Sequence, residues 1–280
     1  MAWVLTTPSS RGIGSALTRH LLRTTPASIP IVATTRSSDP KSTKESLLAD
    51  LDLPHDSAKA SGRLDVQTCD LLNETSIKDL VGYCGDRYQY KDHNGEGGPA
   101  HLRLSFCIPG KLHPEKSPAQ IEYDKALDTM KLNLLAPMML LKHLHPFLPK
   151  KSAKIQPIHG LPNEAVLAFM SARVGSISDN GLGGWYSYRA SKAGLNQLVK
   201  SGDIYQKILS AGNACIVGLH PGTVRTSLSK EFWGNVKEGK LFSPEFSAER
   251  LCEVVKGLGQ RDLDKFRGRC WDWEGKEVPP

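Results

Sequence analysis

The sequence lacks long hydrophobic runs and a recognisable leader segment. Its longest apolar candidate, from Leu132 to Leu141, is short and contains asparagine and proline, whereas a helix that spans a bilayer needs about 18 or more apolar residues in a row. We therefore expect no membrane span. The opening MAWVLTTPSS lacks the basic stretch and cleavage pattern of a secretion signal, so a cytoplasmic location is the default expectation.

Paired cysteines and blocks of one charge are also missing. The six cysteines are scattered without C-x-x-C spacing, so we expect reduced thiols and neither a zinc site nor a disulfide framework. The formal net charge is +7, but lysine and arginine are spread along the chain. Without a basic block interleaved with aromatic residues, a nucleic-acid partner is not expected. A modest positive field also suits a phosphorylated small molecule.

Predicted strands and helices alternate over most of the 280 residues. Short apolar runs that predict strands are Val4–Leu5, Ile31–Thr35, Arg63–Cys69, His101–Ile108, Ala165–Ser171 and Cys215–Leu219. Segments that predict helices are Ile13–Leu22, Glu74–Tyr83, Ile121–Leu144 and Tyr188–Leu209. This alternation predicts an α/β fold with a doubly wound parallel sheet and helices on both faces.

Three segments interrupt that rhythm. Asp86–Ala100 is polar and glycine-rich and predicts a solvent loop. Thr226–Ser243 follows a Pro-Gly turn and mixes aromatic with charged residues, which suits a mobile flap over a site. The tail, Arg267–Pro280, carries two tryptophans and is expected to pack back on the sheet edge.

A glycine turn, TPSSRGIG, joins the first predicted strand to the first predicted helix. In an open α/β sheet, such a turn lets a pyrophosphate approach the N–H groups of a helix N-terminus. Gly12 and Gly14 stand where the turn enters the helix. Their position between strand and helix favours a nucleotide site over an ordinary turn.

The end of the second predicted strand indicates which nucleotide binds. An acidic residue there usually holds a free ribose 2′-hydroxyl, whereas a 2′-phosphate calls for arginine. The strand ends on Arg36, Asp39 comes three residues later, and Arg11 in the glycine turn adds a second cation. This pattern favours NADP over NAD. Asp70 closes the third strand, either to touch the adenine or to cap the following helix.

The stretch WYSYRASKAG contains two tyrosines and one lysine. Tyr188 lies four residues before Lys192 and Tyr186 lies six before it, so only Tyr188 shares a helix face with the lysine. A nearby ammonium lowers the pKa of a phenol and suits it to proton transfer with a carbonyl or alcohol. The alternative is an amphipathic helix with a packed tyrosine and a solvated lysine.

Pro137 lies inside the long predicted helix and has no N–H, so the carbonyl of Asn133, four residues earlier, loses its helical partner. A buried carbonyl must find another donor, and an ordered water is a natural one. Such a water would continue a proton path from Lys192. A simple kink that fits the helix to the sheet is the alternative.

Four motifs together resemble the short-chain dehydrogenase/reductase family: TPSSRGIG, Asn133, Tyr188-x-x-x-Lys192 and HPGTVRT, in the expected order between about Trp3 and Thr226. The resemblance implies one Rossmann-type domain over residues 1–280, with a core at about 3–226, a substrate flap at 226–243 and a C-terminal extension at 244–280. It also implies hydride transfer between a nicotinamide and a carbonyl or alcohol. Tyr188 would be the general acid/base, Lys192 would lower its pKa and hold the ribose, and Asn133 would support a proton relay.

The expected cofactor is NADP, as NADPH, because the resemblance implies a nicotinamide cofactor and Arg36 and Arg11 favour a 2′-phosphate. Its contacts are expected on the glycine turn, at the ends of later strands, around the catalytic pair and on the HPGTVRT turn. These residues are Thr7, Ser9, Ser10, Arg11, Gly12, Ile13, Gly14, Arg36, Asp70, Leu71, Gly110, Tyr188, Lys192, Pro221, Gly222, Val224 and Thr226.

The chain departs from the family pattern at three places. Pro8 replaces the first glycine of the turn, and Cys107-Ile108-Pro109-Gly110 replaces Asn-Asn-Ala-Gly, so only Gly110 is retained. Ala172 stands where a serine usually polarises the substrate oxygen. We favour Ser176 over Ser171 as its substitute, because Gly175 can bend the loop back toward the site. In the alternative, Ser176 caps its own turn.

The sequence therefore predicts an NADPH-dependent oxidoreductase that acts on a small carbonyl or alcohol, and the resemblance implies a homodimer or homotetramer formed through the long central helices. A cofactor-binding sensor or scaffold with little or no turnover is the alternative. Trp185, Phe232 and Trp233 favour an apolar or flat substrate, unless they only pack.

The Arg36→Glu variant tests the choice of nucleotide. It replaces the partner of a 2′-phosphate with a like charge, so it should weaken NADPH binding roughly ten- to hundredfold more than NADH binding. Titration of both cofactors measures the difference. An unchanged preference would remove Arg36 from the site.

Overall fold

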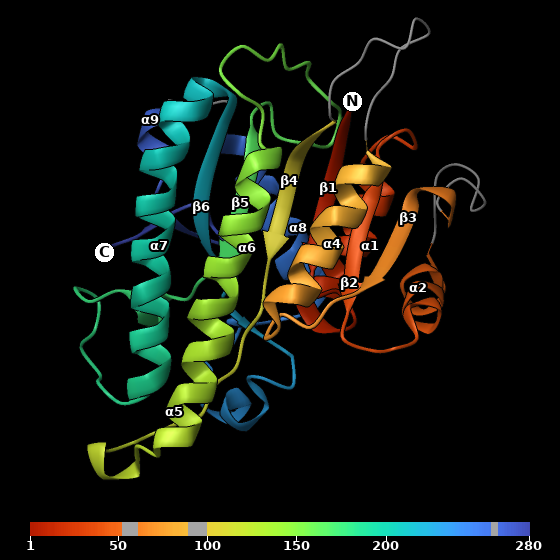
Figure 1. Ribbon diagram of the computed structural model, residues 1–280. Helices are drawn as coiled ribbons and strands as arrows, with labels where there is room; N and C mark the ends of the chain where they lie inside the picture. The colour runs from red at the N-terminus through yellow and green to blue at the C-terminus, as the bar shows by residue number, and fades with distance from the viewer. Residues whose placement is uncertain (52–60, 89–99, 259–262) are drawn as a thin grey trace, which may run out of the picture.

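One sheet of eight strands organises the computed structural model, which describes residues 1–51, 61–88, 100–258 and 263–280 (Figure 1). The strand order is β10-β9-β6-β5-β4-β1-β2-β3, and every neighbouring pair is parallel except β10 with β9. The strands are β1 (Ala2–Thr7), β2 (Ile31–Thr35), β3 (Leu64–Thr68), β4 (His101–Cys107), β5 (Ala165–Met170), β6 (Ala214–His220), β9 (Cys270–Asp272) and β10 (Glu277–Val278).

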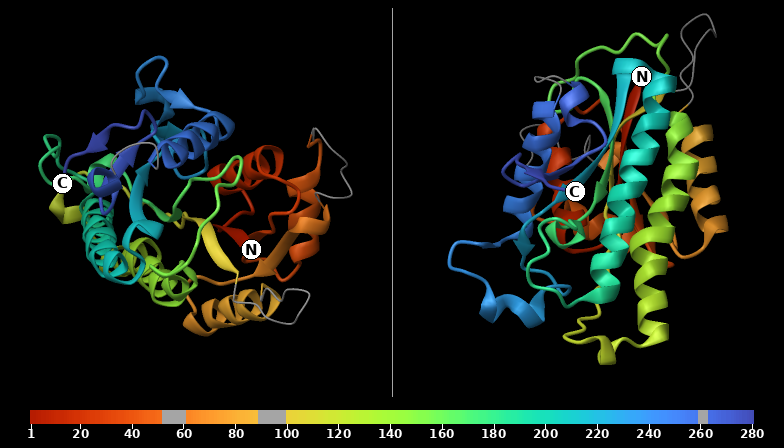
Figure 2. Two further views of the ribbon diagram at one scale, coloured as in Figure 1. Left: turned by 90° about the horizontal axis from the view of Figure 1, so that it is seen from above. Right: turned by 90° about the vertical axis from the view of Figure 1, so that its left-hand side faces the viewer.

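Helices cover both faces of this sheet (Figure 2, left). On one face lie α1 (Gly12–Thr24) and α8 (Pro244–Leu258), and on the other lie α4 (Glu74–Arg87), α6 (Ala136–Leu144) and α7 (Tyr186–Ser210). The shorter α2 (Pro40–Leu48) packs beside β2 and β3, and α9 (Leu263–Phe266) precedes the tail strands. The predicted doubly wound α/β fold is confirmed.

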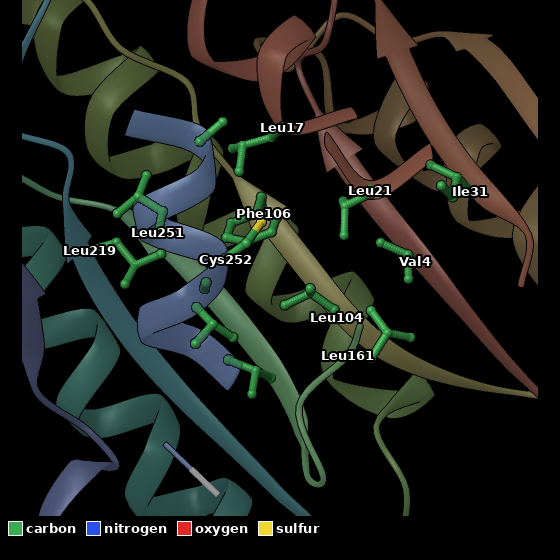
Figure 3. Close-up of a cluster of buried hydrophobic side chains, with 14 of the residues drawn as sticks. Val4, Leu17, Leu21, Ile31, Leu104, Phe106, Leu161, Leu219, Leu251 and Cys252 are labelled. Atoms are coloured by element: carbon green, nitrogen blue, oxygen red, sulfur yellow. The ribbon is translucent and has the colours of Figure 1, made fainter. Parts of the chain in front are cut away.

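The core is split into two layers by the sheet. Val4 points to the cluster under α1 and α8, whereas its neighbours Trp3 and Leu5 point to the cluster under α4, α6 and α7. Figure 3 shows the first layer, where Leu17 meets Phe106 and Cys252. Strands that are covered on both faces read as continuous apolar runs, which is why the sequence revealed them. All six cysteines are buried and free.

The predicted elements agree with the structure to within a few residues, apart from one correction, but two helices and several short elements near the C-terminus, among them β9 and β10, were not predicted. Helix α2 was missed because its sequence, PKSTKESLL, is polar and buries only Leu47. Helix α8 lies in the region beyond the predicted flap and was also missed. The predicted solvent loop Asp86–Ala100 falls largely on residues 89–99, outside the described residues, and its first two residues end α4.

The long central helix is the correction, because it is not one regular helix. It consists of α5 (Tyr123–Met130), a π-helical turn at Lys131–Leu135 and α6. The N–H of Ala136 bonds to the carbonyl of Lys131, five residues back. Pro137 follows directly and offers no N–H. The wide turn is therefore how the helix accommodates the proline, and such turns are frequent at functional sites.

The tail packs against the sheet edge as expected. Strand β9 pairs in parallel with β6, and Arg267 forms a buried ion pair with Asp203 on α7, at 2.8 Å between Nε and Oδ2. The other carboxylate oxygen of Asp203 accepts the N–H of Ile216 in β6. One carboxylate thus joins the helix, the strand and the tail.

The strand order reverses direction between β1 and β4. From β1 the chain proceeds to β2 and β3 on one side, and from β4 to β5 and β6 on the other. Ligands of open α/β sheets bind in the crevice at the carboxyl ends of the strands at this point. Across the described residues, no helix combines the length and apolar character that a bilayer span requires.

Candidate active site

The turn between β1 and α1 brings the backbone close to its surroundings at two glycines. Gly12 has a φ of +58°, and a Cβ there would lie 3.2 Å from Cγ2 of Thr226. A Cβ on Gly14 would lie 2.0 Å from the carbonyl oxygen of Pro8, so only glycine fits. Helix α1 has neither a side-chain cap nor an acidic residue in its first turn. Its first N–H groups, beside the exposed Arg11, therefore suit an anion.

Arg36 is exposed directly after β2. Asp39, the nearest carboxylate along the chain, caps α2 by accepting the N–H groups of Lys41 and Ser42 at 3.1 and 3.3 Å. Because Asp39 is committed to the helix, the end of β2 presents a cation rather than a ribose-binding acid. Within the described part of the chain, the Arg36 guanidinium has no ion-pair partner.

Asp70 and its neighbours lie at the end of β3. The Asp70 carboxylate accepts the N–H of Leu72 at 3.0 Å, and the cap of α4 is Asn73. The alternative role of Asp70 as the helix cap is therefore wrong. Leu71 is buried, whereas Gly110, after β4, is exposed with open space where a Cβ would lie.

Several residues predicted to touch the cofactor turn their side chains into the fold. The Thr7 hydroxyl bonds to that of Thr34 at 2.7 Å, and the Ser9 hydroxyl donates to the Thr6 carbonyl at 2.6 Å. Val224 is buried as well. These residues can offer only backbone groups to a ligand. The remaining predicted contacts reach the surface at least in part, namely Ser10, Ile13, Pro221, Gly222 and Thr226.

Tyr188 and Lys192 lie together on the buried face of α7, where they are 7% and 2% exposed. Nζ of Lys192 lies 5.8 Å from the centre of the Tyr188 ring and donates to the Met170 carbonyl at the end of β5, at 2.7 Å. Tyr186 is only half-buried. The structure thus brings the predicted pair together at the carboxyl ends of the strands.

Burial shifts the pKa of both groups away from the charged form. It raises the pKa of Tyr188 to about 12 and lowers the pKa of Lys192 to about 8. The expected lowering of the Tyr188 pKa by Lys192 is wrong for the chain alone. The cost of burying a charge outweighs the attraction between ammonium and phenolate, and the ammonium hydrogen-bonds to Met170 instead.

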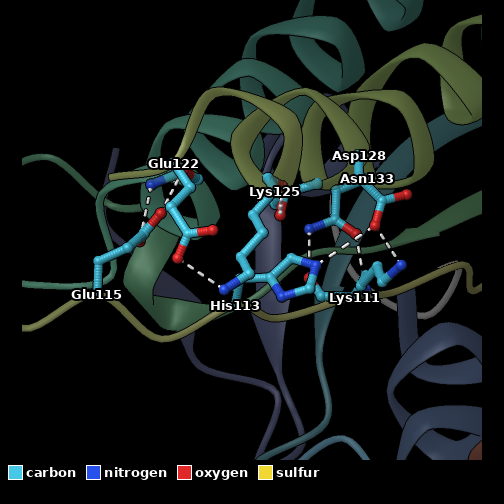
Figure 4. Close-up of polar contacts among 9 residues, drawn as sticks. Lys111, His113, Glu115, Glu122, Lys125, Asp128 and Asn133 are labelled. Atoms are coloured by element: carbon cyan, nitrogen blue, oxygen red, sulfur yellow. Dashed lines mark hydrogen bonds and ion pairs between the residues drawn. The ribbon is translucent and has the colours of Figure 1, made fainter. Parts of the chain in front are cut away.

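The side chain of Asn133 joins three segments of the site (Figure 4). Its Oδ1 accepts the N–H of Lys111 and its Nδ2 donates to the carbonyl of Lys111, both at 2.8 Å. Nδ2 also donates to Oγ of Ser191 at 3.0 Å, and that hydroxyl donates to the carbonyl of Tyr188 at 2.7 Å. The amide therefore ties the segment after β4 to α7, whereas the predicted relay concerned the backbone carbonyl of Asn133.

Glu115 was missed by the sequence reasoning. It is 3% exposed, its carbonyl accepts the N–H of Trp185 at 2.6 Å, and its Oε2 accepts the N–H of Ser187 at 3.2 Å. Its Oε1 accepts the Ser187 hydroxyl. Glu115 therefore caps the first turn of α7 from another part of the chain. Nothing in the loop sequence HPEKSP distinguishes this carboxylate from a solvated one.

The segment around Glu115 is anchored a second time, on α5. Lys111 and His113 both pair with Asp128 (Figure 4). The hydrogen bond from the Lys111 ammonium, helped by the His113 contact and only partly opposed by burial, holds the pKa of that carboxyl below its ordinary value. A polar pocket of about 420 Å³ adjoins it, lined by His113, Pro114, Glu115, Ala119, Gln120, Glu122 and Lys125. We refer to residues 110–116 as the strap.

The arrangement has close structural counterparts. An NADPH-bound carbonyl reductase from chicken fatty liver superposes with a TM-score of 0.75 at 24% identity, over 99% of this chain and 98% of that one. At this identity the likeness shows the fold. No protein-family model matches the chain.

Curated proteins that are similar in sequence include the following two. A 1-hydroxy-2-glutathionyl-2-methyl-3-butene dehydrogenase from Rhodococcus sp. (strain AD45) is 31% identical over 147 residues, or 52% of this chain and 57% of that protein. A benzil reductase ((S)-benzoin forming) from Bacillus cereus is 26% identical and covers 91% of this chain and 94% of that protein. These likenesses agree with the resemblance to the short-chain dehydrogenase/reductase family that the sequence motifs indicate. The match thus spans little more than half of the first relative.

The serine position is where the chain departs most from the family pattern that it resembles. Ser176 Oγ accepts the N–H of Asp179 at 3.0 Å, which is the contact expected of the alternative role as a turn cap. It also approaches the carbonyl of Pro280 in the tail at 3.3 Å. A Cβ on Gly175 would lie 2.8 Å from Lys192, so the glycine packs on α7 and Ser176 turns toward the tail. Ser171 donates to Asn196 at 2.6 Å. The role of Ser176 in polarising a substrate stays a prediction.

The Lys192→Met variant tests the cost of burying the ammonium. Because the folded pKa of about 8 lies below the ordinary value of 10.5, the unfolded chain holds more protons between those pH values, and the penalty on stability is largest below pH 8. We expect Lys192→Met to raise the free energy of unfolding at pH 7 by on the order of 2 kcal/mol, and the gain should shrink as the pH rises past 8.

Urea unfolding of the ligand-free protein across this pH range measures the gain. Lys200→Met, at an exposed position on the same helix, is the matched control and should show little change. A loss of stability at pH 7, or a gain that does not depend on pH, would contradict the expected burial cost.

Proposed function

We propose that the chain binds NADPH at the carboxyl ends of its strands and transfers a hydride between the cofactor and a carbonyl or alcohol substrate. The observation that carries this proposal is the burial of Tyr188 and Lys192 on one face of α7, beside the end of β5. A buried pair of this kind is costly and serves no packing need that apolar residues would not meet.

The residues at the other end of the crevice fit a dinucleotide. Gly12 and Gly14 allow a close backbone approach, the N-terminus of α1 lacks a side-chain cap, and Arg11 and Arg36 are exposed. In this proposal the α1 N–H groups hold the pyrophosphate and the two arginines hold a 2′-phosphate. The chicken neighbour, described as NADPH-bound, supports the same choice. When bound, the reduced nicotinamide supplies the hydride.

The protein supplies the proton and the geometry. With a pKa of about 12, the Tyr188 phenol stays protonated at neutral pH and is suited to donate to a carbonyl oxygen during reduction. Lys192 carries a pKa of about 8, so it exchanges protons near neutral pH and can help to reprotonate the phenol. A carbonyl substrate is also consistent with the Bacillus relative, whose name describes the reduction of benzil.

A sensor or scaffold that binds the cofactor without turnover is the second candidate. One observation favours it: Ala172 replaces a hydroxyl, and the contacts of Ser176 point to the tail. The buried Tyr188 and Lys192 favour the enzyme instead.

The Tyr188→Phe variant tests the proposal. NADPH oxidation with a panel of aldehydes, ketones and quinones should be lost in Tyr188→Phe, while NADPH affinity stays within about twofold, because only the proton donor is removed. Tyr186→Phe is the control and should react normally. If Tyr186→Phe were the inactive variant, the assignment of the acid would be wrong. Binding without any turnover of the panel by the wild type would favour the sensor, and failure to bind NADPH would overturn both candidates.

We also propose that the chain forms a homo-oligomer through its central helices. Ile204, Tyr205 and Ile208 are exposed on α7, and Leu135 and Met138 are exposed on the adjoining helical segments, which stand side by side with α7 in Figure 1. Apolar side chains of this size are costly to leave in water. The cytoplasmic location expected from the sequence stays a prediction.

Sedimentation equilibrium tests the interface. The wild type should sediment as a dimer or tetramer, and Ile208→Glu should dissociate it because a charge would be buried. Leu182→Glu, in an exposed loop, should leave the assembly unchanged. A monomeric wild type would refute the interface.

A further inference from the structure

A tryptophan with a left-handed backbone begins helix α7. Trp185 has φ 51° and ψ 45°, a conformation that bulky L-residues avoid because the Cβ crowds the following carbonyl. Gly183 and Gly184 precede it, also with positive φ. A strained backbone persists only where the surroundings impose it, and such strain clusters at functional sites.

The strap imposes this conformation. The N–H of Trp185 is bound by the carbonyl of Glu115 at 2.6 Å, and the Glu115 carboxylate holds both the N–H and the hydroxyl of Ser187. A Cβ on Gly184 would lie 3.3 Å from the Glu115 carbonyl oxygen. Trp185 is therefore held by its own N–H bond to the Glu115 carbonyl and by the bonds of the Glu115 carboxylate to Ser187, two residues later. On its other side, Gly184 allows the chain to pass close to Glu115.

The strain places the indole between the proposed acid and the flap. The Trp185 ring lies edge-on to the ring of Tyr188, at 6.2 Å between centres, and against the ring of Phe232, at 4.8 Å. Trp185 and Phe232 are both half-buried, so neither residue is fully covered.

The flap runs from the cofactor end of the crevice to this tryptophan. It starts beside the glycine turn, where Thr226 approaches Gly12, and forms a short 3₁₀ helix over Lys230–Asn235 that carries Phe232. The adjacent Trp233 is held differently, because its indole N–H donates to Ser229 at 2.9 Å. Through Phe232 and Trp185, the flap that starts beside the glycine turn is thus connected to the ring of Tyr188.

We propose that Trp185 and Phe232 form an aromatic wall against which a planar ring of the substrate packs, so that the preferred substrates are ketones whose carbonyl is attached directly to an aromatic ring. This inference rests on the proposed function. The carbonyl carbon accepts the hydride from NADPH and the carbonyl oxygen accepts the proton of the Tyr188 hydroxyl, which gives a secondary alcohol and NADP⁺. Aromatic pairs add free energy beyond the area that they bury, so the wall distinguishes a flat ring from a puckered one.

A matched pair of ketones tests the wall. Acetophenone and cyclohexyl methyl ketone are both methyl ketones with a six-membered ring, which is planar, aromatic and conjugated with the carbonyl only in acetophenone. The difference in intrinsic reactivity cancels when the ratio of their kcat/KM values is compared between variants. Phe232→Leu and Trp185→Leu should each lower the ratio of kcat/KM for acetophenone to that for the cyclohexyl ketone by about three- to tenfold. Trp185→Phe should retain most of the ratio. Leucine at position 185 has the same left-handed backbone strain as tryptophan, so the substitution adds no new strain. If Trp185→Leu nevertheless fails to fold, Phe232→Leu still tests the wall, because it leaves the backbone at position 185 unchanged.

Binding gives a readout without turnover. In the presence of NADPH, 1-phenylethanol cannot react, and calorimetry should show that it binds the wild type about three- to tenfold more tightly than 1-cyclohexylethanol does, with the difference lost in Phe232→Leu. Trp233→Leu is the matched control on the same 3₁₀ helix and should keep the wild-type preference.

The outcomes separate the inference from the proposed function. Equal binding of the two alcohols by the wild type, or unchanged ratios in both leucine variants, would overturn the wall while leaving carbonyl reduction intact. Equal losses for both ketones would show that the two rings only hold the flap, and would also overturn it. If the wild type neither bound NADPH nor reduced any carbonyl, the proposed function itself would fail.

Discussion

The buried carboxylate of Glu115 fixes where helix α7 begins, and the geometry of the site depends on that start. Its two oxygens hold the backbone and the hydroxyl of Ser187, one residue before Tyr188, so a shift of the cap would rotate the tyrosine out of the crevice. The Asn133 amide makes a second link of this kind between the strap and α7, because it binds Lys111 in the strap and Ser191 on the helix. Buried polar groups that are fully hydrogen-bonded specify one geometry, whereas apolar contacts tolerate several.

The same burial sets the electrostatics of the proposed acid and its lysine. Each group resists its charged form, as the pKa values of about 12 for Tyr188 and about 8 for Lys192 indicate. In the chain alone, a neutral phenol faces a lysine that titrates close to neutrality. Charge placed between them by a ligand would act in a medium that screens it poorly. A charged ligand that binds beside α7 should therefore shift the pKa values of Tyr188 and Lys192 strongly.

The sequence predicted the strands and the Tyr188–Lys192 pair because both follow from local periodicity: apolar runs mark strands buried on two faces, and a four-residue spacing marks one face of a helix. It missed Glu115, whose partner Ser187 lies 72 residues away. Ser176 was also judged from spacing alone, whereas its contacts depend on Pro280, 104 residues further along the chain. The direction of the Tyr188 pKa shift was wrong because burial, a property of the whole fold, outweighs a neighbouring charge.

The C-terminal tail also protects an edge of the central sheet, away from the proposed site. If β9 did not pair with β6, the N–H and C=O groups along one side of β6 would form an open edge, and a long apolar edge strand invites pairing between molecules. Strand β9 covers that edge, and β10, only two residues long and antiparallel, ends the sheet. So short an outer strand offers little template for another chain. The segment that follows the proposed flap thus protects the protein against edge-to-edge aggregation.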